Sequence, residues 1–286
     1  MNQAQVNTGK KWVAASAMVG LAALALVATP TSAHHPSVVK IGGTGGALGG
    51  LQLLAKSFMK SNPETRIVVL PSLGSGGGIK ALAVGKIDLA LSARKLKKTE
   101  QAKGIVATAY AKTPLIFATR HDSAISSVSQ EDLAGIYAGK KSSWSDGSRL
   151  RLVMRPAKES DNKLLYNLST EIKTAALSAT KRSDLYVART DQDNANAIER
   201  VRGSLGITTL GQITAEGRDI KPLAFNGVDG TIENLEKGAY PHSKTFYIVS
   251  KPEHTRAVAE FLQFVASPQG RSILSSSNHV VVDTSG

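Results

Sequence analysis

Two glycine-rich segments are the parts of this chain best suited to chemistry, because each stands between a predicted strand and a predicted helix. The first covers residues 42–50 and follows the apolar run 37–41. The second covers residues 74–78 and follows the run 66–70. Glycine lets backbone N–H groups approach a ligand, and a helix start carries partial positive charge. The two segments, about 30 residues apart, therefore predict one oxyanion held between two helix starts.

Two serines add possible donors near the second glycine segment. Ser75 offers a hydroxyl beside the unhindered N–H of Gly76. Ser92 ends the predicted strand 87–92, and α/β sheets place ligand contacts at the carboxyl ends of their strands. A serine in that position also commonly serves only as a turn or capping residue.

Arg155 is the charged candidate, because it ends a predicted strand and its planar guanidinium suits oxyanions. A helix is predicted to begin at Ser160, Asp161 and Asn162, so their N–H groups could face the same anion. The alternative is a surface arginine paired with Glu159 or Asp161.

Other chemistries lack their motifs. The first segment reads Gly43-x-Gly45-x-x-x-Gly49, which differs from the dinucleotide fingerprint, and neither segment ends in Gly-Lys-Ser/Thr. The six histidines show no metal-ligand spacing, the chain has no cysteine, and no Gly-x-Ser-x-Gly elbow is present. We therefore predict no cofactor, no metal, no catalytic residue and no enzyme. Tight turns without a ligand remain the alternative for the glycine segments.

Residues 1–33 have the pattern of a secretory signal peptide. Lys10 and Lys11 are basic, residues 13–28 are apolar, and Thr31-Ser32-Ala33 is a small-residue cleavage site. We expect cleavage after Ala33 and a periplasmic protein. An uncleaved membrane anchor is the alternative, but the apolar run is short for a span of about 20 residues.

The net charge of +13 comes from dispersed basic residues, and only 5% of the chain is aromatic. Export and the lack of basic stretches with interleaved aromatics argue against nucleic acid as a partner. A solvated basic surface and the steering of anions remain as explanations.

Alternating strands and helices predict an α/β fold with largely parallel strands. We expect two lobes, one from residues 34–114 plus 226–286 and the other from residues 115–225. The chain would cross near Ala118 and again near residues 223–226. This is a bilobed clamp, and the cleft between its lobes is the expected ligand site.

Four segments carry a resemblance to a known family: residues 73–80, 88–92, 233–241 and 261–270. They resemble the periplasmic phosphate-binding proteins of ABC importers and their type-II solute-binding relatives, over nearly the whole mature chain. The resemblance implies a Venus-flytrap fold, two α/β lobes joined by two crossover strands, that closes on an oxyanion. It implies delivery to an ABC permease in the inner membrane, and we expect a monomer.

The resemblance also implies a set of ligand contacts. Leu48 would give a backbone N–H, Ser75 its hydroxyl and N–H, and Arg155 the charged clamp. With the flanking positions, the predicted binding residues are Gly46, Ala47, Leu48, Ser75, Gly76, Ser92, Arg155, Ser160, Asp161 and Asn162.

The chain departs from the family at three places that bear on the ligand. After Arg155 the usual Ser-Gly-Thr is replaced by Ser160-Asp161-Asn162, set one residue further along. Ala47 stands where members often have threonine, and Ala93 stands where they have an acidic residue that accepts the proton of hydrogen phosphate. Two functions follow: capture of phosphate or a related oxyanion for an ABC importer, or an interaction or sensory protein that has lost phosphate transport. An exported phosphatase-like enzyme is a weaker third idea.

Overall fold

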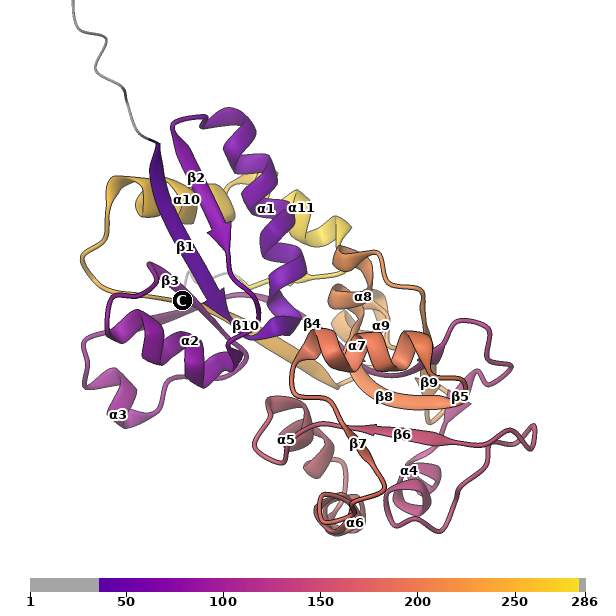
Figure 1. The fold of residues 1–286 in the computed structure, drawn as a ribbon. Coiled ribbons are helices and arrows are strands. Elements are labelled where there is room, and N and C mark those ends of the chain that lie inside the picture. The colour runs from indigo at the N-terminus through magenta and orange to yellow at the C-terminus, as the bar shows by residue number, and fades with distance from the viewer. Residues whose placement is uncertain (1–35, 283–286) are drawn as a thin grey trace, which may run out of the picture. The chain divides into compact units, whose positions relative to one another are not determined.

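The computed structural model describes residues 36–282, apart from the side chains of residues 163 and 164, and has a mixed α/β fold (Figure 1). The predicted signal peptide, residues 1–33, lies outside the described residues. Within residues 36–282 no helix combines the length and the apolar character that crossing a membrane requires.

The first half of the fold is a sheet around β1 (Ser37–Gly43), which pairs in parallel with β2 (Thr65–Val69) and β3 (Leu89–Ser92). β10 (Ser243–Ser250) lies antiparallel to β3. The other elements here are η1 (Gly45–Ala47), α1 (Leu48–Ser61), α2 (Gly74–Ala83), α3 (Lys98–Gln101), α10 (Arg256–Ala266), α11 (Pro268–Ser276) and β11 (Val280–Val281).

β4 (Val106–Arg120) belongs to both halves of the fold. Its first part, Val106 to Pro114, pairs with β10, and its second part pairs with β8 (Ser204–Thr209) and β9 (Ile220–Phe225). The second half also contains β5 (Ser127–Val128), α4 (Gln130–Tyr137), β6 (Arg151–Met154), α5 (Ser160–Tyr166), α6 (Thr170–Ala179), β7 (Tyr186–Val187), α7 (Asp191–Arg200), α8 (Leu210–Glu216) and α9 (Ile232–Glu236).

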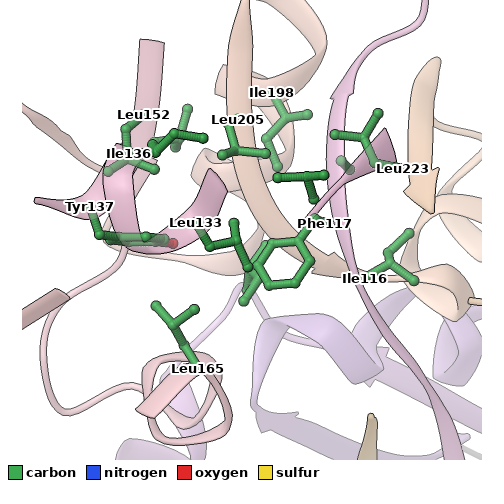
Figure 2. Packing of buried hydrophobic residues seen from close by; sticks show 14 of the residues in the cluster. Ile116, Phe117, Leu133, Ile136, Tyr137, Leu152, Leu165, Ile198, Leu205 and Leu223 are labelled. Carbon is green, nitrogen blue, oxygen red and sulfur yellow. The ribbon is translucent and has the colours of Figure 1, made fainter. Parts of the chain in front are cut away.

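Each half has its own hydrophobic core. In the first half, α1 and α10 meet through the buried rings of Phe58 and Phe261, whose centroids are 5.3 Å apart in an edge-to-face arrangement. In the second half, Phe117 of β4 lies with Leu133 of α4 and Leu205 of β8 in a separate cluster (Figure 2). Burial of apolar side chains therefore stabilises the strands of each half within that half.

The spacing of apolar residues predicts helices over residues 130–137 and over about 256–266, and the structure confirms both as α4 and α10. Other boundaries differ. Apolar residues as far as Leu168 predict a helix that is capped by Ser160 and continues to that leucine. The observed helix, α5, instead includes Ser160 and ends at Tyr166. The sequence also predicts a break over residues 267–270 and a new helix from Arg271, but α11 already starts at Pro268, because proline suits the first turn of a helix.

The sequence predicts that residues 74–78 form a loop before a short helix over residues 79–84, but the structure shows that these glycines already belong to α2. Gly74–Gly78 forms the first turn of α2, and α2 packs closely against β1. A Cβ atom on Gly78 would lie 2.7 Å from the Gly43 Cα, so only glycine permits this approach.

Hydroxyl caps fix where several helices begin. Thr190 is the cap that matters most for the site: its hydroxyl accepts from the Asp193 N–H at 3.0 Å, and the Asp193 carboxylate accepts from the Thr190 N–H at 3.1 Å. This reciprocal capping box sets the start of α7 and so places Asp191 at its first position.

His279 gives the fold a measurable pH dependence. Its side chain is buried between Gly50 and Gly211, and burial, which disfavours the charged imidazolium, lowers its pKa to about 4. The unfolded chain binds a proton near pH 6.5, so this histidine contributes stability above that pH that is lost as the pH falls towards 4. We expect the free energy of unfolding to fall by about 2 kcal/mol from this source between pH 7 and pH 5.

The check is urea unfolding of the wild type and of His279→Gln across that pH range. Other groups titrate equally in both proteins, so the difference between their pH slopes isolates His279. Parallel slopes would contradict a neutral, buried imidazole.

Candidate functional site

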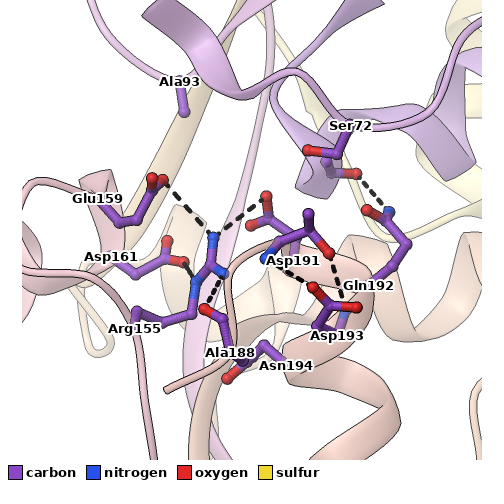
Figure 3. A network of polar contacts seen from close by, with 12 residues as sticks. Ser72, Ala93, Arg155, Glu159, Asp161, Ala188, Asp191, Gln192, Asp193 and Asn194 are labelled. Carbon is purple, nitrogen blue, oxygen red and sulfur yellow. Dashed lines mark hydrogen bonds and ion pairs between the residues drawn. The ribbon is translucent and has the colours of Figure 1, made fainter. Parts of the chain in front are cut away.

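Arg155 is the centre of a buried cluster of charged side chains at the end of β6 (Figure 3). Its side chain is 3% exposed, and its Nη1 donates to the Ala188 carbonyl oxygen at 2.7 Å. Oxygens of Glu159, Asp161 and Asp191 each lie 3.6 Å from a guanidinium nitrogen. The guanidinium is thus balanced by charge, while its Nε, within residues 36–282, has no hydrogen-bond partner.

Lys244 is the second buried cation of the cluster. Its Nζ donates to Asp161 Oδ1 at 2.6 Å and to Asp191 Oδ1 at 3.3 Å. It lies on β10, where Phe246 and Ile248 follow it at a spacing of two on the buried face. The strand therefore carries a lysine into the interior, where two carboxylates stabilise its charge.

The charges of this cluster stabilise one another against desolvation. Burial by itself raises the pKa of Asp191, but attraction to Lys244 and Arg155 outweighs it and holds that pKa below the usual range. Burial likewise lowers the pKa of Lys244, and Asp161 and Asp191 more than compensate, so the net shift is upward. For Glu159 burial is the larger effect and raises the pKa. Asp191 and Lys244 are therefore an ion pair at neutral pH.

The first glycine segment faces the start of α7. Gln192 Nε2 donates to the Gly45 carbonyl oxygen at 3.0 Å, and a Cβ on Gly45 would lie 2.7 Å from Asp191 Oδ2. The Gly46 N–H adds to the forces that keep Asp191 ionised. The next two N–H groups are bonded inside the segment: Ala47 to Thr44, and Leu48 to Gly45.

The second glycine segment faces a cleft of 810 Å³, which is also lined by Ala93, Glu159, Ser160 and Lys244. Ser75 Oγ accepts from the Ala93 N–H at 3.0 Å. In the part of the chain that the structure describes, the Ser75 hydroxyl donates no hydrogen bond, so its proton is available to an acceptor in this cleft.

Two further predicted residues, Ser92 and Asn162, form hydrogen bonds to the protein's own backbone. Ser92 is fully buried, and its hydroxyl donates to the Arg94 carbonyl oxygen at 2.7 Å and accepts from the Arg94 N–H, so it acts as a turn residue. The Asn162 amide donates to the carbonyl oxygens of Arg155 and Pro156 and so holds the connection between β6 and α5. The alternative interpretation of Arg155 is a surface arginine paired with Glu159 or Asp161. The two pairs are present, but the arginine is buried, so the surface location is wrong.

Sequence reasoning missed Asp191 and Lys244. A signal existed for both: Thr190-x-x-Asp193 is a capping box, and Lys244 shares the two-residue period of Phe246 and Ile248. Neither signal says that the two side chains meet, because 53 residues separate them. As for metal ions, residues 36–282 contain no group of three or more histidine or acidic side chains arranged to hold one.

Comparison with known proteins supports the family resemblance that the sequence shows. Residues 30–269 match the model of a family described as a PBP superfamily domain. The phosphate-binding protein PstS of Bacillus subtilis is 23% identical over 239 residues, which are 80% of this chain and 75% of that protein. PstS of Borreliella burgdorferi is also 23% identical, over 87% of this chain and 92% of that protein.

A solved structure with the same kind of fold supports this comparison. A Clostridium perfringens protein, assigned as the substrate-binding protein of a phosphate ABC transporter and solved with bound phosphate, aligns with a TM-score of 0.72. The alignment covers 86% of this chain and 100% of that one, at 18% identity. The predicted α/β fold with two lobes is thereby confirmed.

The pairing of Lys244 can be tested through stability. Lys244→Met keeps the length of the side chain but leaves two buried carboxylates without their ammonium group. Removing one partner of a buried ion pair costs about 3–5 kcal/mol. We expect a loss of that size in the free energy of unfolding, measured by urea titration.

Lys237→Met is the matched control. Lys237 also pairs with a carboxylate, Glu233, but its side chain is 67% exposed, and exposed pairs contribute about 0–1 kcal/mol. Equal losses for the two variants would mean that burial gives the Lys244 pair no special weight.

Proposed function

Since the chain belongs to the PBP superfamily domain family, we propose that it is an extracytoplasmic solute-binding protein that captures phosphate or a related oxyanion between two lobes for an ABC importer. The phosphate-binding names of its relatives support this choice of ligand class. Solute-binding relatives also support the absence of catalytic activity, which forms part of the proposal.

The observation that carries the proposal is the state of Arg155. Arg155 is 3% exposed, and its buried Nε has no hydrogen-bond partner in residues 36–282 and only the Asp161 carboxylate at 3.6 Å. Such a donor is costly unless another acceptor completes it. A tetrahedral oxyanion supplies acceptors that match a guanidinium. We propose that Arg155, the Gly46 N–H, the Ser75 hydroxyl, the Gly76 N–H and the start of α5 at Ser160 contact the anion.

Nearby cations differ in their availability. Arg94 borders the cleft, but its Nη1 and Nη2 donate to the two carboxylate oxygens of Glu100 at 2.7 Å each. This bidentate pair satisfies Arg94 locally, so it provides general positive potential rather than a direct contact. We therefore assign the charged contact to Arg155.

The proposed lobes are residues 34–114 plus 226–286 and residues 115–225. A separate core supports this division for residues 115–225, which make up one cluster. Tyr240, from the range assigned to the first lobe, also packs in that cluster. The Tyr240 hydroxyl donates to the Leu115 carbonyl oxygen at 2.7 Å, which joins the returning chain to the outgoing crossover. Such joined crossover segments suit hinge closure around a ligand.

Export and partners complete the proposal. We propose that the signal peptide is removed after Ala33, that the mature protein works in the periplasm as a monomer, and that it delivers the anion to an ABC permease in the inner membrane. The extracytoplasmic placement of PstS-like proteins supports this location.

One specific observation favours the second candidate, an interaction or sensory protein that has lost phosphate transport. The carboxylates of Asp161 and Asp191 already balance both buried cations. Binding measurements separate the two functions, because the second candidate requires no affinity for phosphate.

The test is isothermal titration calorimetry of the mature chain with phosphate, sulfate, molybdate and tungstate. We expect binding of at least one anion and about tenfold weaker binding by Ser75→Ala, since a hydrogen bond to a charged group contributes about 1.5–3 kcal/mol. Ser75 lies outside the buried ion pairs, so this variant should fold.

Ser178→Ala is the control, because Ser178 is exposed on α6 away from the cleft, and its affinity should equal that of the wild type. The absence of heat and of any thermal shift with all four anions would refute the proposed capture of an oxyanion.

A further inference from the structure

The geometry points to Asp191 as a built-in anion: its carboxylate lies where the oxyanion would sit, between the first glycine segment, Arg155 and Lys244, and an incoming anion must displace it. This inference rests on the proposed function and adds the residue that sets the affinity of the same site.

Both carboxylate oxygens of Asp191 lie near cationic groups that would also contact a bound anion. Oδ1 accepts from Lys244 Nζ at 3.3 Å, and Oδ2 lies 3.6 Å from Arg155 Nη2. A Cβ on Gly45 would come within 2.7 Å of Oδ2, so the carboxylate is pressed against the glycine segment. The Gly46 N–H also stabilises the charge. Two cations and a glycine backbone are the contacts that an oxyanion seeks.

The other carboxyl groups of the cluster do not take this position. Asp161 lies on α5 and contacts Lys244 and Arg155, but the atoms nearest to a Cβ on Gly45 or Gly46 belong to other residues, Asp191 among them. Glu159 is 33% exposed and contacts Arg155 from the side of the cleft. Among the described carboxyl groups, Asp191 alone joins both cations to the glycine segment.

Arg155 shows that Asp191 is an incomplete substitute. All three carboxylates stay at 3.6 Å from the guanidinium, outside hydrogen-bond distance, so the buried Nε has the Asp161 carboxylate nearby but no hydrogen-bond partner in residues 36–282. Asp191 cannot move closer freely, because the capping box of Thr190 and Asp193 and the bond from Gln192 to Gly45 fix the start of α7. An external anion with more oxygens could satisfy the donors that Asp191 leaves unpaired.

A fixed carboxylate in the site also changes which anions bind well. Like charges a few ångströms apart repel strongly in a buried environment. A phosphate dianion must therefore displace the Asp191 carboxylate, and this displacement costs part of the binding free energy. Asp191 thus lowers the affinity of the site relative to one with a neutral residue at this position.

The experiment compares phosphate affinities of the wild type, Asp191→Asn and Asp161→Asn by calorimetry on the mature chain. Asparagine keeps the shape and an oxygen acceptor for the Gly46 N–H while removing the charge. We expect Asp191→Asn to bind phosphate at least tenfold more tightly than the wild type. Asp161→Asn is the matched control, since it removes an equal charge at the same 3.6 Å from Arg155 without opening the glycine segment, and its gain should stay below threefold.

The possible results separate the two proposals. Equal gains for both variants would mean a general charge effect and would overturn the role given to Asp191. Wild-type binding with no gain in Asp191→Asn would overturn this inference and leave the capture of phosphate intact. No binding by any of the three proteins would overturn both. Binding by Asp191→Asn alone would support the built-in anion and would mean that the wild-type site is held closed to phosphate.

Folding of each variant is checked by circular dichroism and thermal unfolding. If Asp191→Asn does not fold, Asp191→Ser replaces it, because serine is small, neutral and tolerated at a helix start. The same tenfold gain is expected of it, and an unchanged affinity in folded Asp191→Ser would count against the inference.

Discussion

The ion pairs around Arg155 and Lys244 are the constraint on which the site depends. Two cations enter the interior from different strands, Arg155 from the end of β6 and Lys244 from β10. Buried charges persist only with partners, and here α5 and α7 each supply one through Asp161 and Asp191. The cluster therefore links the first half of the fold, which holds β10, to the second half, which holds β6, α5 and α7.

Close backbone approach is the second requirement of the same site. The first glycine segment can lie against Asp191 because Gly45 has no Cβ, and α2 can pack on β1 because Gly78 has none. In the first segment this approach brings the Gly46 N–H to the Asp191 carboxylate. This contact is made by the backbone, and the alanine side chains at positions 47 and 93 provide no polar group.

Much of the architecture could be predicted from local patterns. Helices α4 and α10 have clear apolar periods, and α4 also has a capping box, so both helices could be predicted with nearly correct limits. The first turn of α2 was not, because a run of glycines has low helix propensity and only packing against β1 makes it helical. In the candidate site, Arg155 and the glycine segments carried signals, whereas Asp191 and Lys244 looked like an ordinary helix start and strand residue.

The sequence by itself determined the two-lobed α/β fold, the glycine segments and an arginine suited to an anion, because these depend on local periodicity and on residue type. Only the tertiary structure decided what the glycine segments face. The second borders a cleft with the Ser75 hydroxyl available, while the first is met by the protein's own Asp191. The physical reason is that a buried charge selects its partner by position in space, and residues 155, 191 and 244 become neighbours only once both halves of the fold have formed.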